Sequence, residues 1–145
     1  GGKRAELAQA WGADEVILTG ARPLTPDLLR KGGVDRALVS AAPQAIGPAL
    51  GLLRYGGILA YIGIAYGDGA RVTFDANEFH FKKLQLRASH AAPALYFPTV
   101  LDLLRDGHVD GAAIISHTFT LERIAEAMCF ARDQRAEVLK VVVTC

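Results

Sequence analysis

The apolar run 58–65, ILAYIGIA, constrains the fold more than any other feature of the chain. It is nearly continuous in apolar residues, whereas a strand with one face in water alternates apolar and polar side chains. A strand of this kind is buried on both faces, which is typical of a parallel sheet covered by helices. Because parallel neighbours need long crossover connections, we expect a helix between successive apolar runs.

Short apolar runs and helical patterns do alternate along the chain. This order predicts an α/β fold built on a partial doubly wound, Rossmann-type parallel sheet with right-handed crossovers. Thr25 and Thr120 are expected to cap helix N-termini. The expected strands are 15–18, 34–42, 58–65, 71–74, 84–89, 114–119 and 138–144, and the expected helices are 3–10, one beginning after Thr25, 45–53, 77–82, 96–105 and 120–132.

Composition excludes several classes of protein. The formal net charge of +1 gives no electrostatic reason for binding nucleic acid or an anionic membrane. No apolar stretch approaches the roughly 18 residues of a membrane span. Two distant cysteines fit a reducing cytoplasm better than a disulfide framework. The four histidines lack the spacing of a metal site, so we expect no metal ligand and no catalytic residue in this chain.

Three short segments lie at the carboxyl ends of predicted strands and are candidates for ligand binding. In open α/β sheets, ligands lie beyond the carboxyl ends of the strands. The strand that begins at Val34 ends in Ser40, Ala41 and Ala42, whose small side chains allow a flat ligand to approach the backbone. The next strands lead to Ile62, Gly63 and Ile64, and to Ser89 and His90. The alternative interpretation of segment 40–42 is tight strand-to-helix packing of small residues, and that of Gly63 is an ordinary glycine at a turn.

Several motifs carry a resemblance to a known family. They are GGVDRALVSA (32–41), LLRYGGILAYIGI (52–64), FKKLQLRASH (81–90), YFPTVLDLLRDGHVD (96–110), AAIISHTFTLERIAEAM (112–128) and EVLKVVVT (137–144). In order and spacing, from Arg4 onward, the chain resembles the C-terminal part of the zinc-type medium-chain alcohol and polyol dehydrogenases. Ala88 departs from the pattern, which usually has glycine there.

The resemblance implies a partial NAD- or NADP-binding domain over residues 1–90 and a segment, 91–145, that returns to a catalytic domain outside this chain. It implies an intact enzyme that acts on a small alcohol, polyol or carbonyl substrate, with zinc bound outside this chain. The sorbitol and threonine dehydrogenase branches look most similar. There are two alternatives. One is a zinc-free quinone or enal reductase of the same fold, and the other is a non-catalytic dinucleotide-binding or structural module.

The resemblance also assigns roles to individual positions. It places Ile62–Ile64 beside the nicotinamide, with Ser89 and His90 at a second nicotinamide-contacting turn. Arg4 is expected near the adenosine ribose and Lys140 near the pyrophosphate. Family members commonly form homo-oligomers by pairing the strand that corresponds to 84–89. We expect Gly63→Val to weaken dinucleotide binding more than it weakens the fold.

Overall fold

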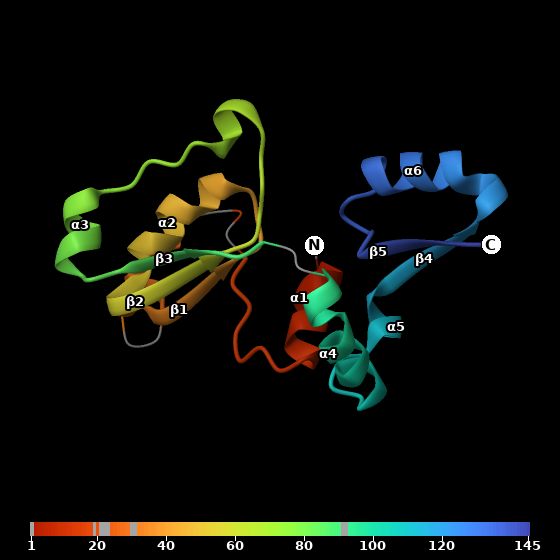
Figure 1. Ribbon diagram of the computed structural model, residues 1–145, viewed down its shortest axis with the longest axis horizontal. Coiled ribbons are helices and arrows are strands. Elements are labelled where there is room, and N and C mark those ends of the chain that lie inside the picture. Colours follow the sequence, from red (N-terminus) through yellow and green to blue (C-terminus); the bar gives the residue numbers. More distant parts are fainter. Residues whose placement is uncertain (1, 19, 21–23, 30–31, 91–92) are drawn as a thin grey trace. The chain divides into compact units, whose positions relative to one another are not determined.

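The computed structural model describes residues 2–18, 20, 24–29, 32–90 and 93–145 (Figure 1). Two compact units make up the chain. The central unit contains residues 18–91, and the terminal unit contains residues 1–17 and 92–145. No helix among the described residues is long and apolar enough to span a bilayer. The division of an intact enzyme into domains at residues 90 and 91 stays a prediction.

The central unit is built on a three-stranded parallel sheet in the order β1 (Val34–Val39), β2 (Leu53–Tyr61), β3 (Gln85–Ala88). Helix α2 (Ile46–Gly51) joins β1 to β2, and helix α3 (Ala76–Phe81) precedes β3. Short 3-10 turns lie at Pro26–Leu28 (η2), Pro43–Ala45 (η4) and Gly67–Ala70 (η5). The parallel α/β sheet confirms the predicted fold class.

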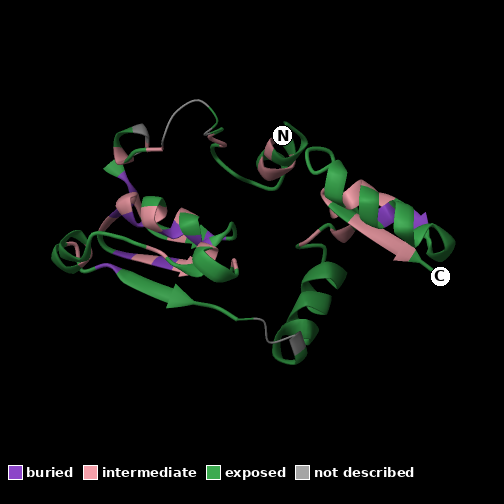
Figure 2. Cartoon of the chain, turned by 90° about the horizontal axis from the view of Figure 1, so that it is seen from above, coloured by how far each residue is buried: buried purple, intermediate pink, exposed green. Residues whose placement is uncertain are grey.

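One small core stabilises this unit. Leu59 on β2 is 0% exposed and Leu53 is 2% exposed, and both pack with Ile46 and Leu50 of α2. Figure 2 shows the buried residues gathered where α2 meets the sheet. Burying leucine-sized side chains stabilises a fold by about 1.5–3 kcal/mol each, so this contact fixes α2 on the strands. The strand ends that flank α2 are thereby held in register.

The terminal unit contains a second parallel pair, β4 (Ile115–Thr120) and β5 (Lys140–Thr144). The turn η6 (Leu121–Arg123) and helix α6 (Ile124–Asp133) connect them, and α1 (Gly2–Ala10), α4 (Pro93–Arg105) and α5 (Gly111–Ile114) complete the unit. The pairing shifts register at Ser116. There the Ser116 hydroxyl accepts hydrogen bonds from the N–H groups of Leu139 and Lys140, at 3.0 and 3.3 Å, and so partners the backbone where the ladder is interrupted.

Two predicted strands are wrong. Residues 15–18 and 71–74 have no strand structure, and Leu18 is 71% exposed. An apolar run becomes a strand only where a neighbour accepts its hydrogen bonds. In the part of the chain that the structure describes, the central sheet has only β1, β2 and β3, and neither run pairs with them.

Both ends of β2 and the caps at Thr25 and Thr120 also differ from prediction. Strand β2 begins at Leu53 and passes through Gly56 and Gly57, where the sequence suggested a break. The backbone tolerates this because Gly56 has φ +72° and the register with β1 shifts there. The strand ends at Tyr61 rather than residue 65. Thr25 and Thr120 precede 3-10 turns, and neither side chain makes the expected capping hydrogen bond.

Candidate functional site

The carboxyl ends of the three central strands lie level with one another. Val39 pairs with Tyr61, and Tyr61 pairs with Ala88. The ladder continues one step further, because the Ile62 N–H donates to the Val39 carbonyl at 3.1 Å and the Ser89 N–H donates to the Tyr61 carbonyl at 3.0 Å. The predicted segments 40–42, 62–64 and 89–90 therefore emerge from the same edge of one sheet. We call these residues the carboxyl edge.

Gly63 fixes the distance between two of these segments. A Cβ built on Gly63 would lie 1.8 Å from the Ala41 carbonyl oxygen and 2.7 Å from its carbon. Real Cβ atoms essentially never approach backbone atoms within 3.0 Å. Only a residue without a side chain allows segment 62–64 to lie against segment 40–42 in this way. Gly63 thus brings the ends of β1 and β2 into direct backbone contact.

This contact corrects one expectation from the sequence. We expected Gly63→Val to disturb dinucleotide binding more than the fold, but the valine side chain would have to displace the backbone at Ala41. Overpacking of this kind destabilises a protein by about 1–3 kcal/mol. Gly63 is therefore more than an ordinary glycine at a turn, because its missing side chain is needed for the contact with Ala41.

Most residues of the carboxyl edge are exposed, and several of them have small side chains. Ser40, Ala41 and Ala42 are exposed, as are Ser89 and His90. Ile62 and Ile64 are 50% and 73% exposed. The short side chains of segment 40–42 and the absence of one at Gly63 suit a flat ligand that needs close approach to N–H and carbonyl groups. A dinucleotide has such flat rings, so the residues present fit that group.

Arg4 and Lys140 belong to the terminal unit. The Arg4 guanidinium donates a 2.7 Å hydrogen bond to the Val138 carbonyl, which ties α1 to the segment that leads into β5. Lys140 begins β5, is exposed, and pairs in register with Ile115. The sequence contained no signal for the Arg4–Val138 contact, because the two residues are 134 positions apart.

No described part of the chain offers a metal site. Among these residues, no group of three or more histidine, cysteine, aspartate or glutamate side chains could hold an ion. Zinc therefore does not fit the residues described, and we derive no step through it.

Shifted pKa values occur on η6 and α6. The hydrogen bond from Arg123 lowers the pKa of Glu126, and the hydrogen bond from Arg132 lowers the pKa of Asp133. Both pairs are solvated surface contacts.

Comparison with known protein families gives one match, over residues 1–106, to the model described as zinc-binding dehydrogenase. The chain belongs to the zinc-binding dehydrogenase family. This family assignment confirms the resemblance seen in the ordered motifs. A comparison with curated proteins finds no match.

Solved structures share the fold over nearly the whole chain. An alcohol dehydrogenase from E. coli CFT073, described as short-chain and complexed with NADH, has TM-score 0.86 and 23% identity, and the match covers 99% of this chain and 42% of that one. Alcohol dehydrogenase from Thermus sp. ATN1 has TM-score 0.80 and 27% identity, with 98% and 41% covered. A putative zinc-binding dehydrogenase from Sinorhizobium meliloti 1021, bound to NADP, has TM-score 0.85 and 20% identity, with 99% and 43% covered.

These coverages show how much of such a protein the chain represents. The family member described here spans about two fifths of the length of the structures that it matches, 41–43% for the three named above. The two structures that are less than 25% identical to this chain establish its fold alone. The activity of a complete dehydrogenase is therefore a matter for proposal.

Proposed function

We propose that this chain is the cofactor-binding part of an NAD(P)-dependent oxidoreductase of the alcohol or polyol dehydrogenase type. The observation that carries the proposal is the level carboxyl edge of β1–β3, with Gly63 packed directly on the Ala41 backbone. Similar structures that hold NADH and NADP support a dinucleotide as the ligand. A sorbitol- or threonine-dehydrogenase-like substrate and a cytoplasmic location belong to the same proposal.

The chain's own residues would bind and orient the cofactor. Segment 40–42 faces the adenosine half, and the backbone of 62–64 meets the nicotinamide carboxamide, with Ser89 and His90 completing that side. Arg4 and Lys140 are assigned to the ribose and the pyrophosphate. The bound dinucleotide supplies or accepts the hydride, so the protein's contribution here is position and exclusion of water. No residue of this chain is assigned a catalytic role.

The purified 145-residue chain should show no alcohol oxidation, because none of its described residues form a zinc site. The assay follows NADH formation with several secondary alcohols and polyols, with and without added zinc. A complete zinc alcohol dehydrogenase serves as the positive control. Zinc-dependent turnover by the chain itself would refute this assignment.

The chain should self-associate through a sheet edge. Strand β3 is an edge strand whose four residues are all exposed, which leaves backbone groups available for pairing across a twofold axis. Light scattering over a range of concentrations should show dimers. Leu86→Pro removes one N–H and should shift the population toward monomer. A chain that stays monomeric at high concentration would contradict the dimer proposal.

A further inference from the structure

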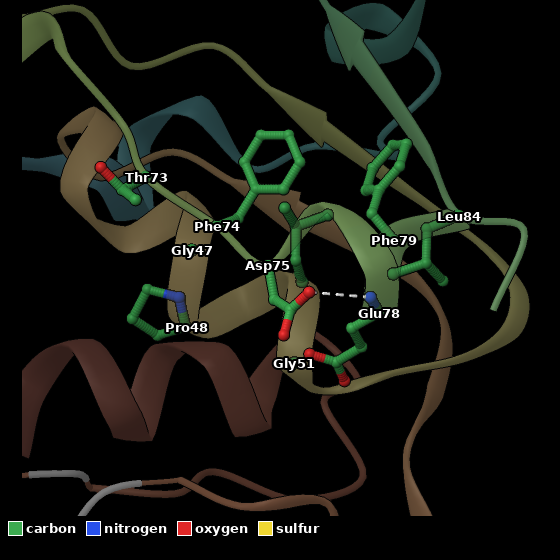
Figure 3. Close-up of a pocket in the computed structure, with 10 residues that line it drawn as sticks. Gly47, Pro48, Gly51, Thr73, Phe74, Asp75, Glu78, Phe79 and Leu84 are labelled. Atoms are coloured by element: carbon green, nitrogen blue, oxygen red, sulfur yellow. Dashed lines mark hydrogen bonds between the residues drawn. The ribbon is translucent and has the colours of Figure 1, made fainter. Parts of the chain in front are cut away.

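A cavity of about 270 Å³ lies in the central unit between α2 and α3 (Figure 3). Its lining includes Leu50 and Leu84, which are 4% and 7% exposed. The rings of Phe74 and Phe79, 5.2 Å apart between centroids, form an apolar wall. Leu84 directly precedes β3 and Leu50 lies three residues before β2, so this part of the cavity lies near the amino ends of these strands.

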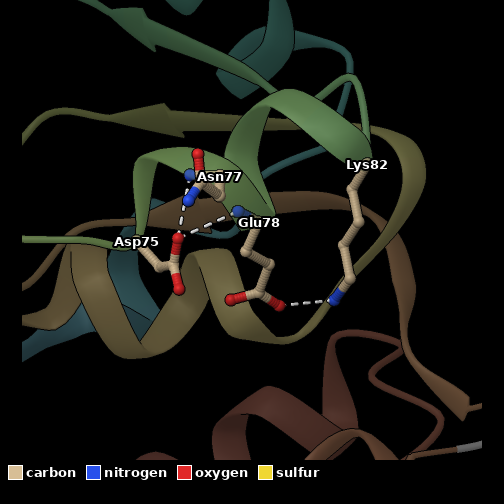
Figure 4. Close-up of polar contacts among 4 residues, drawn as sticks. All are labelled: Asp75, Asn77, Glu78 and Lys82. Carbon is tan, nitrogen blue, oxygen red and sulfur yellow. Dashed lines mark hydrogen bonds and ion pairs between the residues drawn. The ribbon is translucent and has the colours of Figure 1, made fainter.

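Two carboxylates give this apolar cavity an acidic side. Asp75 and Glu78 both line it, and Figure 3 shows their carboxylates together, on the opposite side of the drawn residues from the two rings. One Asp75 oxygen accepts hydrogen bonds from the N–H groups of Asn77 and Glu78, at 2.8 and 3.0 Å. Glu78 pairs with Lys82 at 2.6 Å (Figure 4). The carboxylates of Asp75 and Glu78 therefore carry two negative charges, of which the Lys82 ammonium balances one.

Two of the α2 residues that line the cavity, Gly47 and Gly51, have no side chain. The backbone at Thr73 approaches α2 so closely that a Cβ on Gly47 would lie 2.9 Å from the Thr73 carbonyl oxygen. One turn later, a Cβ on Gly51 would meet no atom within 4 Å. Gly51 therefore leaves room that a larger side chain would occupy.

We infer that this cavity binds a small organic ammonium ion, with its apolar body against Phe74, Phe79 and the buried leucines and its charge at Asp75 and Glu78. The excess negative charge selects a cation over a neutral or anionic compound of the same shape, because Coulomb attraction near a protein surface is several times stronger than in bulk water. The apolar wall selects an organic ion over a bare metal cation, which would gain nothing from phenyl rings and leucines. The inference is independent of the proposed dinucleotide site.

Benzylammonium is the probe for this site, and benzyl methyl ether is its neutral counterpart. Amide NMR of the full 145-residue chain should show shifts at residues 73–79 and 84 with benzylammonium, and at least roughly tenfold weaker binding of the ether. Asp75→Asn keeps an oxygen that can cap α3 but removes the charge, so it should weaken benzylammonium about tenfold with α3 intact. Asp102→Asn on α4 makes the same charge change in the terminal unit and should leave the affinity unchanged.

Filling the cavity provides a second, independent variant. Gly51→Leu should abolish benzylammonium binding, whereas the smaller Gly51→Ala should retain it. Equal affinities for benzylammonium and the ether would overturn the ammonium assignment. Absence of shifts at residues 73–79 and 84, or unchanged affinity in Asp75→Asn, would overturn the site itself, and that result stands even if Gly51→Leu does not fold.

Discussion

Gly63→Ala should lower the free energy of unfolding of the central unit by about 3 kcal/mol, although it adds only one carbon atom. The added Cβ would lie 1.8 Å from the Ala41 carbonyl oxygen, and that oxygen belongs to the backbone and cannot rotate away. Either segment 40–42 or segment 62–64 must therefore move. Gly63→Val, with two further methyl groups, should destabilise the unit at least as much.

Urea unfolding followed by circular dichroism measures this effect, and Gly51→Ala is the matched control. The same atom is added there, but into open space within a helix. Because alanine favours helix over glycine by up to about 1 kcal/mol, the control should be neutral or slightly more stable. Equal stabilities for Gly63→Ala and the unmodified chain would show that the ends of β1 and β2 are not packed as described.

Ser40→Trp should raise the dissociation constant for NADH at least roughly tenfold, equivalent to about 1.4 kcal/mol, with little change in stability. Ser40 directly follows β1 and is exposed, so a large ring there covers the carboxyl edge without entering the core. Substitutions at exposed positions usually change stability by less than about 0.5 kcal/mol. This variant separates ligand binding from folding, which no substitution at Gly63 can do.

Isothermal titration calorimetry with NADH, and separately with NADPH, provides the affinities. Asn77→Trp places the same ring at an exposed position of α3, near the amino ends of the strands, and should bind both dinucleotides like the unmodified chain. If Ser40→Trp and Asn77→Trp have equal affinities, segment 40–42 does not contact the cofactor.

The sequence predicted the elements whose pattern is local. Residues 58–61 of the apolar run form the carboxyl-terminal part of β2, the middle strand of the described central sheet, as their apolar pattern predicted. The run at 15–18 looked similar but formed no strand, since pairing depends on a neighbour that a local pattern does not contain. The passage of β2 through Gly56 was missed for a related reason, because burial of Leu53 and pairing with Val34 decide where the strand begins.

The common position of the candidate segments was predictable from the sequence, but the contacts between them were not. The rule that ligands lie beyond carboxyl strand ends selected segments 40–42, 62–64 and 89–90, and the structure does place them at one edge. The contact of Gly63 with Ala41 depends on how two loops pack in three dimensions, which a glycine in a sequence does not reveal. The binding roles of these residues, and of Arg4 and Lys140, stay predictions.

An NMR titration of the 145-residue chain with NADH tests the dinucleotide assignment most directly. The carboxyl edge predicts that amide shifts concentrate at Ser40–Ala42, Ile62–Ile64 and Ser89–His90, while Gly51, Glu78 and Leu84, which line the cavity between α2 and α3, stay unchanged. Shifts confined to other regions, or no shifts at the carboxyl edge at millimolar NADH, would contradict the assignment of this edge to the cofactor.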